Sequence, residues 1–230
     1  MLNTEQQDLW DAYLRVEARG SREQKLSSLE QFLAKLEPSP MDEWADWARS
    51  IAERCVDNSE DFQIRMPLFR RAIFPVLLAG LQQKRTGYAR WLAGLSQQLY
   101  GCKECRDQLP DDMQTEIGLL HAAIQHDPND SESRLKMLQA WAWQLDYTVH
   151  EVPAGVLHGN DGATPAQCLE LQEWLDEFVE LATTQNQVER YRHLIEKCRL
   201  HFWAYHEYLI SQNQFGSYRD YLEKRPSNHV

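Results

Sequence analysis

The sequence lacks an apolar run long enough to cross a membrane. Its longest apolar run, from Ala72 to Leu81, has about half of the ~20 residues that a membrane-spanning helix needs, and Pro75 interrupts it. The first eight residues are polar and acidic, unlike a secretory signal peptide. We therefore expect no membrane association and a cytoplasmic location.

Cysteine is also scarce, with five residues in a chain of 230. An odd, small number of cysteines in a chain of this length does not indicate a disulfide framework. Cys102 and Cys105 are the only close pair. We expect both thiols to be reduced, free of metal and near the end of a helix.

The alternation of apolar and polar residues that marks a half-buried strand is absent, because no stretch keeps it for more than four residues. Apolar residues instead recur at helical spacing along most of the chain. The prediction is an all-α protein, an antiparallel helical-hairpin stack or irregular bundle of about nine to eleven helices. We expect a single helical domain over 1–230, with possible sub-lobes 1–109 and 110–230.

Capping signals place several helix starts. Three pairs have capping-box spacing: Thr4 with Gln7, Ser21 with Gln24, and Thr164 with Gln167. Pro75 lies inside the helix expected to begin at Pro67, and should bend or break it near residues 73–74.

One junction resembles a tetratricopeptide repeat. In the segment Leu120-His-Ala-Ala-Ile-Gln-His-Asp-Pro128, a small residue, Ala123, precedes a proline by five positions, as at the end of that repeat. The resemblance covers about ten residues and implies two neighbouring helices that pack as a hairpin. We find no repeat of fixed period elsewhere in the chain.

Charge is divided unevenly along the chain, whose formal net charge is −11. Residues 62–103 contain seven Lys/Arg and no Asp/Glu, whereas residues 137–189 contain nine Asp/Glu and no Lys/Arg. The two blocks could face each other inside the fold, or the acidic block could face a basic partner. The sequence does not decide between these arrangements.

The function that we favour is a non-enzymatic protein-binding module whose acidic region, 137–189, docks a basic protein partner. An immunity-type or antitoxin-type protein that neutralises a toxin would suit this charge. We expect no catalytic residue and no cofactor. The long non-helical segment 150–162 and the acidic helix after it supply the candidate binding residues: Glu151, His158, Asn160, Asp161, Glu170, Glu173, Asp176 and Glu177.

The alternative is a metal-dependent all-α hydrolase similar to nucleotide phosphohydrolases. Carboxylates three and four residues apart on the acidic helix could hold Mg²⁺ if a second acidic helix faced them. That helix could come from the segment carrying Asp107, Asp111, Asp112 and Glu116. The competing interpretation is the solvated face of an amphipathic helix, which we favour.

A zinc site is a second metal hypothesis. Cys102 and Cys105, followed by His121 and His126, have the loose spacing of a four-ligand set. However, His121 and His126 are five residues apart, so they do not share one face of a helix. We favour two thiols at a helix end and two solvated histidines.

An aromatic segment follows a group of basic residues near the C-terminus. Four basic residues within 190–199 precede His201-Phe-Trp-Ala-Tyr-His-Glu-Tyr208, a pattern that can hold single-stranded nucleic acid. Phe202, Tyr205 and Leu209 also form an ordinary apolar stripe. We therefore expect packing and not nucleic-acid binding.

Overall fold

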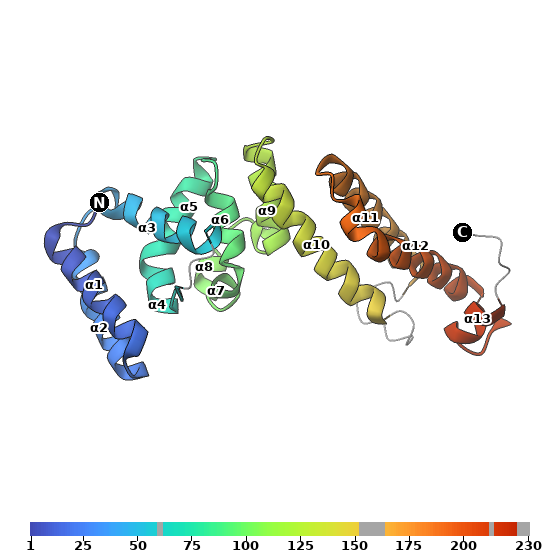
Figure 1. Ribbon diagram of the computed structural model, residues 1–230, viewed down its shortest axis with the longest axis horizontal. Helices are drawn as coiled ribbons and strands as arrows, with labels where there is room; N and C mark the ends of the chain where they lie inside the picture. The colour runs from blue at the N-terminus through green and yellow to red at the C-terminus, as the bar shows by residue number, and fades with distance from the viewer. Residues whose placement is uncertain (59–61, 152–163, 212–213, 225–230) are drawn as a thin grey trace. The chain divides into compact units, whose positions relative to one another are not determined.

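The computed structural model describes residues 1–58, 62–151, 164–211 and 214–224 (Figure 1). The all-α prediction is confirmed, because these residues form helices and no strand, and the number of helices is close to that expected. Within the described residues, no helix has both the length and the apolar character of a membrane span. The chain divides into two compact units, 1–130 and 131–230, so the boundary lies beyond the sub-lobe boundary suggested after residue 109.

Unit 1 contains the shorter helices, which are blue to green in Figure 1. In chain order they are α1 (Thr4–Arg19), α2 (Arg22–Leu36), α3 (Met41–Val56), α4 (Met66–Leu68), the π-helical segment η1 (Phe69–Ile73), α5 (Phe74–Gln82), α6 (Tyr88–Gly94), α7 (Ser96–Tyr100), α8 (Lys103–Arg106), the 3-10 turn η2 (Asp111–Met113) and α9 (Glu116–His126).

The first helices pack around a cluster of aromatic rings. The Trp10 ring lies 5.1 Å from Phe32 and 5.0 Å from Trp47, measured between centroids, which joins α1, α2 and α3. The capping box at Ser21 forms as predicted. The box at the first helix is one residue earlier than predicted, because Asn3 and Gln6 form it and Thr4 is already helical.

Pro75 neither breaks nor ends its helix. An α-helix would need a Pro75 N–H to bond the carbonyl of Arg71, and the proline ring would meet that carbonyl. The backbone avoids both problems by widening into η1, where the Phe74 N–H donates to the Phe69 carbonyl, five residues back. The helix therefore runs continuously from α4 through η1 to α5.

The contact between α5 and α6 requires a glycine. A side-chain Cβ at Gly80 would lie 1.9 Å from the ring of Tyr88, so only glycine allows this ring to cover α5. Gly87 adopts a φ of 89° where the chain turns into α6, a conformation that glycine adopts without steric cost.

Arg90, on α6, joins three segments of unit 1. Its Nη2 lies 2.8 Å from Asp57 Oδ2 at the end of α3, and its Nη1 pairs with Asp130. The Trp91 Nε1 also donates to Asp57 Oδ2, at 2.8 Å. The three charged side chains are largely withdrawn from water, with the side chain of Arg90 12% exposed, so each one needs its partners.

Unit 2 consists of α10 (Ser131–Glu151), α11 (Pro165–Thr184), α12 (Val188–Ser211) and α13 (Tyr218–Lys224), yellow to red in Figure 1. Its core is a stripe from each long helix, and α12 packs against both α10 and α11. Leu145, Leu175, Phe178, Cys198 and Phe202 are among the buried side chains at its centre.

Tyrosine side chains fasten α13 to α12. The Tyr218 hydroxyl lies 3.0 Å from His201 Nδ1, and the Tyr221 hydroxyl donates to Glu207 Oε2 at 2.5 Å. The Tyr218 ring also meets Tyr205 edge to face, with centroids 4.9 Å apart. Burial, followed by the nearby Lys197 charge, lowers the pKa of His201 below its ordinary value.

The junction that resembles a tetratricopeptide repeat has its two key residues where the resemblance places them. Ala123 is buried in α9, and Pro128 lies in the turn between α9 and α10. These two helices belong to different compact units. The hairpin packing that the resemblance implies therefore stays a prediction.

We predict that Arg90→Met destabilises unit 1 by about 3 kcal/mol, because removing one partner leaves the carboxylates of Asp57 and Asp130 poorly solvated and unneutralised. Urea unfolding followed by circular dichroism measures this change. Arg85→Met, at an exposed position just before α6, is the matched control and should change stability by less than about 0.5 kcal/mol. Equal losses in the two variants would contradict the stabilising role of Arg90.

We also predict that acid destabilises unit 2 through His201. Because the folded-state pKa is lowered, the unfolded chain binds a proton first as the pH falls. The stabilisation is complete above about pH 6.5 and is lost as the pH falls below it, until folded His201 is also protonated. Between pH 7.5 and 5, the melting temperature should fall further in the wild type than in His201→Gln. The exposed-site control His193→Gln should follow the wild type, and parallel curves for wild type and His201→Gln would refute the assignment.

Candidate functional site

The candidate site is the outer face of α11. The helix begins as predicted, with a complete capping box between Thr164 and Gln167 and with Pro165 in its first turn. Its inner face is a stripe at helical spacing that is buried mainly against α12: Cys168, Leu171, Leu175, Phe178 and Ala182. This stripe fixes the orientation of the helix and therefore the residues that face solvent.

The opposite side of α11 carries carboxylates and two large apolar side chains. We call these residues the α11 outer face: Leu169, Glu170, Glu173, Trp174, Asp176, Glu177 and Glu180. All seven are exposed, and Leu169 and Trp174 are each 48% exposed. Glu170 and Glu177 lie four residues before and three residues after Trp174, so both flank its indole ring along the helix.

None of these five carboxylates pairs with a basic side chain among the described residues of unit 2. Two acidic groups on other helices of unit 2 do have partners. Asp146, on α10, lies 3.8 Å from Lys197 Nζ, and Glu189 pairs with Arg192 on α12. The α11 outer face therefore combines several negative charges that no cation in the described part of unit 2 neutralises.

Unit 1 shows a contrasting arrangement, because several of its basic residues pair with carboxylates of unit 1. Arg65 makes two hydrogen bonds of 2.7 Å to Glu17, and this guanidinium holds the pKa of Glu17 below its usual range. Arg71 bonds Glu37 at 2.6 Å and Glu30 at 2.5 Å. Arg65, Arg71 and Arg90 are three of the seven basic residues in the block 62–103.

The other predicted binding residues lie in or beside the segment before α11. Glu151 is the last residue of α10 and is partly exposed. His158, Asn160 and Asp161 lie outside the residues that the structure describes. The binding role expected for these three residues therefore stays a prediction.

Sequence reasoning missed the exposed aromatic side chains of unit 2. Trp174 was not distinguished from its acidic neighbours, although it lies off the buried stripe. On α10, Trp143 and Tyr147 are 70% and 56% exposed and stack with centroids 5.9 Å apart. Their spacing of four residues, outside the stripe of Leu138, Leu145 and Val149, was the signal that could have revealed them.

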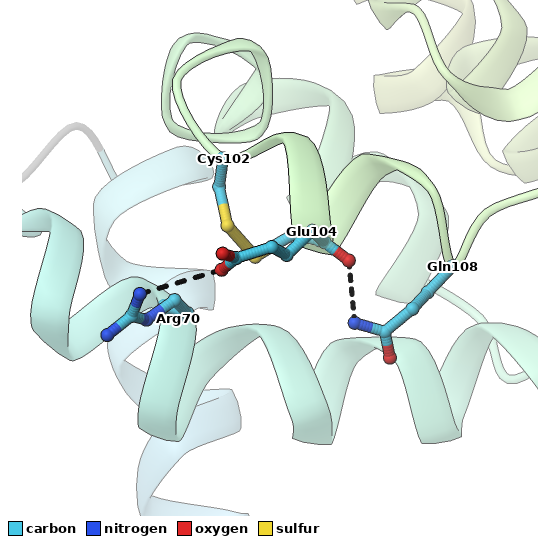
Figure 2. The surroundings of a disulfide bond; sticks show 5 residues. Arg70, Cys102, Glu104 and Gln108 are labelled. Atoms are coloured by element: carbon cyan, nitrogen blue, oxygen red, sulfur yellow. Dashed lines mark hydrogen bonds and ion pairs between the residues drawn. A yellow bond between two sulfur atoms is a disulfide. The ribbon is translucent and has the colours of Figure 1, made fainter.

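The prediction of reduced thiols at residues 102 and 105 is wrong. Cys102 and Cys105 are joined by a disulfide bond (Figure 2). The expected position near a helix end is correct, because Cys102 caps the start of the four-residue helix α8 and Cys105 lies within it. The sequence argument failed because it judged the total number of cysteines and not the short reach between these two.

Neither metal hypothesis gains support from the geometry. The bonded sulfurs of Cys102 and Cys105 are not thiolates, so they do not complete a zinc set with His121 and His126. Among the described residues, no group of three or more His, Cys, Asp or Glu side chains could hold a metal ion. The acidic helix α11 and the segment carrying Asp107 to Glu116 belong to different units.

The aromatic segment of α12 is largely part of the core. Phe202 and Tyr205 are buried, and Leu209 packs against the same cluster. Their rings therefore do not form an open platform on which bases could stack. Trp203 faces outward on the same helix and is 37% exposed.

Comparison with known proteins adds no relative from which a function could be inferred. The chain matches no protein-family model, no curated protein and no solved structure.

We predict strongly different reactivities among the remaining thiols. Burial raises the pKa of Cys168 to about 11 and that of Cys198 to about 12. At pH 8 only about a thousandth or less of either thiol is ionised, so iodoacetamide should leave both unmodified in the folded protein. The partly exposed Cys55 should be modified first, as read by mass spectrometry of peptides. Modification of Cys198 at the rate of Cys55 would contradict the buried core of unit 2.

Proposed function

We propose that this protein is a docking module that binds a basic protein partner through the α11 outer face. The observation that carries the proposal is the set of five exposed carboxylates without basic partners among the described residues of unit 2. A complementary positive surface would be attracted to this face and oriented by it.

The contrast between the two units supports this interpretation. In unit 1 the largely buried arginines need internal partners, and carboxylates of that unit supply them. On α11 the carboxylates reach bulk water, so the fold tolerates them without partners. Because they pair with no basic side chain that the structure describes in unit 2, we expect their charge to be available to another molecule.

Trp174 and Leu169 provide apolar surface, whose burial can supply the binding free energy that charge alone does not. Exposed ion pairs contribute only about 0–1 kcal/mol each, so a purely acidic face steers a partner but holds it weakly. Tryptophan is among the residues that most often dominate binding energy at interfaces. A partner arginine placed over the exposed indole ring could also pair with Glu170 or Glu177 beside it.

A neutralising role, as in immunity-type or antitoxin-type proteins, suits this chemistry. Such a protein acts by covering a basic surface of its target and needs no catalytic group of its own. The alternative of a metal-dependent hydrolase has no comparable observation in its favour, since the described residues contain no metal-binding cluster. Added Mg²⁺ or Zn²⁺ with a panel of nucleotides tests that alternative directly.

We predict that Glu173→Lys/Glu177→Lys weakens partner binding by roughly tenfold or more near 0.15 M salt, because the face loses negative charge and gains repulsive positive charge. The experiment captures partners from lysate of the source organism on the immobilised full chain, and then repeats the measurement with the captured protein purified. Wild-type affinity should also fall as salt rises.

The matched control is Asp8→Lys/Asp46→Lys. It changes net charge by the same amount at two exposed positions of unit 1, and it should bind like the wild type. Equal loss in both double variants would mean that overall charge and not this face governs binding. Unchanged binding in Glu173→Lys/Glu177→Lys, with its circular dichroism spectrum intact, would refute the proposal.

A further inference from the structure

The Cys102–Cys105 disulfide lies within one short helix. It joins Cys102, at the start of α8, to Cys105 inside it. Only two residues separate the cysteines, and their Cα atoms lie 5.3 Å apart. The entropy lost on closing a loop grows with loop length, so a disulfide that closes so short a loop restricts the unfolded chain far less than one joining distant segments. The bond therefore contributes little as a structural cross-link.

Both cysteines are buried, and Cys105 borders a cavity of about 410 Å³. The cavity lies between α8 and the helix that runs through η1 and α5. Its wall is mixed. The side facing α3 and α5 is largely apolar and includes Ala79, and the polar lining residues are Arg70, Gln82, Glu104 and Gln108. The widened π-helical turn lies at this wall, and such turns recur at functional sites.

Few polar interactions hold α8 in place at the cavity rim. The ion pair between Arg70 Nη1 and Glu104 Oε2 spans 3.5 Å, and both side chains are exposed (Figure 2). Gln108 Nε2 donates to the Glu104 carbonyl at 2.9 Å, which is a contact within the same short segment. Exposed ion pairs contribute little, so the position of α8 depends mainly on the packing of its buried Cys102 and Cys105 side chains.

We propose that Cys102 and Cys105 form a reversible thiol–disulfide site that a dithiol reductant reaches through this cavity. The site is separate from the α11 outer face and does not depend on the docking function. The other three cysteines, Cys55, Cys168 and Cys198, are free thiols.

The exchange proceeds in two steps. A thiolate of the dithiol attacks Cys105 Sγ and forms a mixed disulfide, while Cys102 leaves as a thiolate and takes a proton from water. The second thiol of the reductant then attacks its own sulfur in the mixed disulfide, releasing Cys105, which is also protonated. Two electrons and two protons reach the protein, and the dithiol becomes a disulfide.

Reduction changes the cavity wall. Two unbonded sulfur atoms must separate to van der Waals distance, and the cavity beside Cys105 gives room for this movement. We expect the four-residue helix α8 to shift with its sulfurs, which alters the rim that Glu104 and Gln108 form. The oxidised and reduced proteins then present different cavities to a ligand.

The test treats the full-length folded protein with dithiothreitol, then with oxidised glutathione, and counts modified thiols by mass spectrometry. We expect Cys102 and Cys105 to become modified together in the absence of urea and to be protected again after glutathione treatment. Hydrogen exchange over residues 102–109 should be faster in the reduced than in the oxidised protein. The control substitution Cys55→Ser should not change exchange in this segment. A disulfide that yields only when urea unfolds the chain, or unchanged exchange after reduction, would overturn the proposal.

Access through the cavity is tested by filling it. Ala79→Phe places a ring in the cavity and should slow reduction by roughly tenfold or more. Gln83→Phe, on the exposed surface just after α5, is the matched control and should leave the rate unchanged. Equal rates in the two variants, with unchanged melting temperatures, would show that the reductant does not reach Cys105 through the cavity.

Discussion

The pairing of largely buried arginines with carboxylates is the constraint on which unit 1 depends. Arg90 is placed between Asp57 and Asp130, so it must be neutralised where water no longer screens its charge. The same requirement accounts for Arg65 beside Glu17. Because these pairs join residues far apart in sequence, they fix how α3, α6 and the end of unit 1 fit together.

This constraint explains why a charge count along the sequence was misleading for half of the molecule. The basic block of residues 62–103 looks uncompensated when only its own stretch of sequence is considered. In the folded unit four of its five arginines meet carboxylates, at positions 17, 30, 37, 57, 104 and 130. Proximity in sequence therefore says little about which charges remain without a partner.

Local features of the fold were predictable because they depend on neighbouring residues. The capping boxes at Ser21 and Thr164 and the buried stripe of α11 all follow from patterns within one or two helical turns. The widening at η1 was not predictable in detail, because a proline inside a helix can be accommodated by a kink, a break or a π turn. Tyr88 covering Gly80 likewise required knowledge of which helices pack together.

The candidate site was predictable only in part, for the same reason. Carboxylates at spacings of three and four mark one face of α11, and the structure leaves Glu170, Glu173, Asp176 and Glu177 exposed on it. The sequence could not distinguish this face from an acidic surface that meets a basic block, nor identify Trp174 as exposed. Both distinctions depend on burial, which arises from packing against α12 and not from the local pattern.

The position of Trp174 gives the acidic face its specific character. A solvated acidic helix needs no large apolar side chain on its outer surface, and exposing an indole ring to water is unfavourable. Fold stability therefore does not account for the ring, whereas an interface that buries it would recover that free energy on binding. Carboxylates around the ring would repel acidic partners and admit basic ones, so attraction would set orientation while burial of the ring supplied most of the affinity.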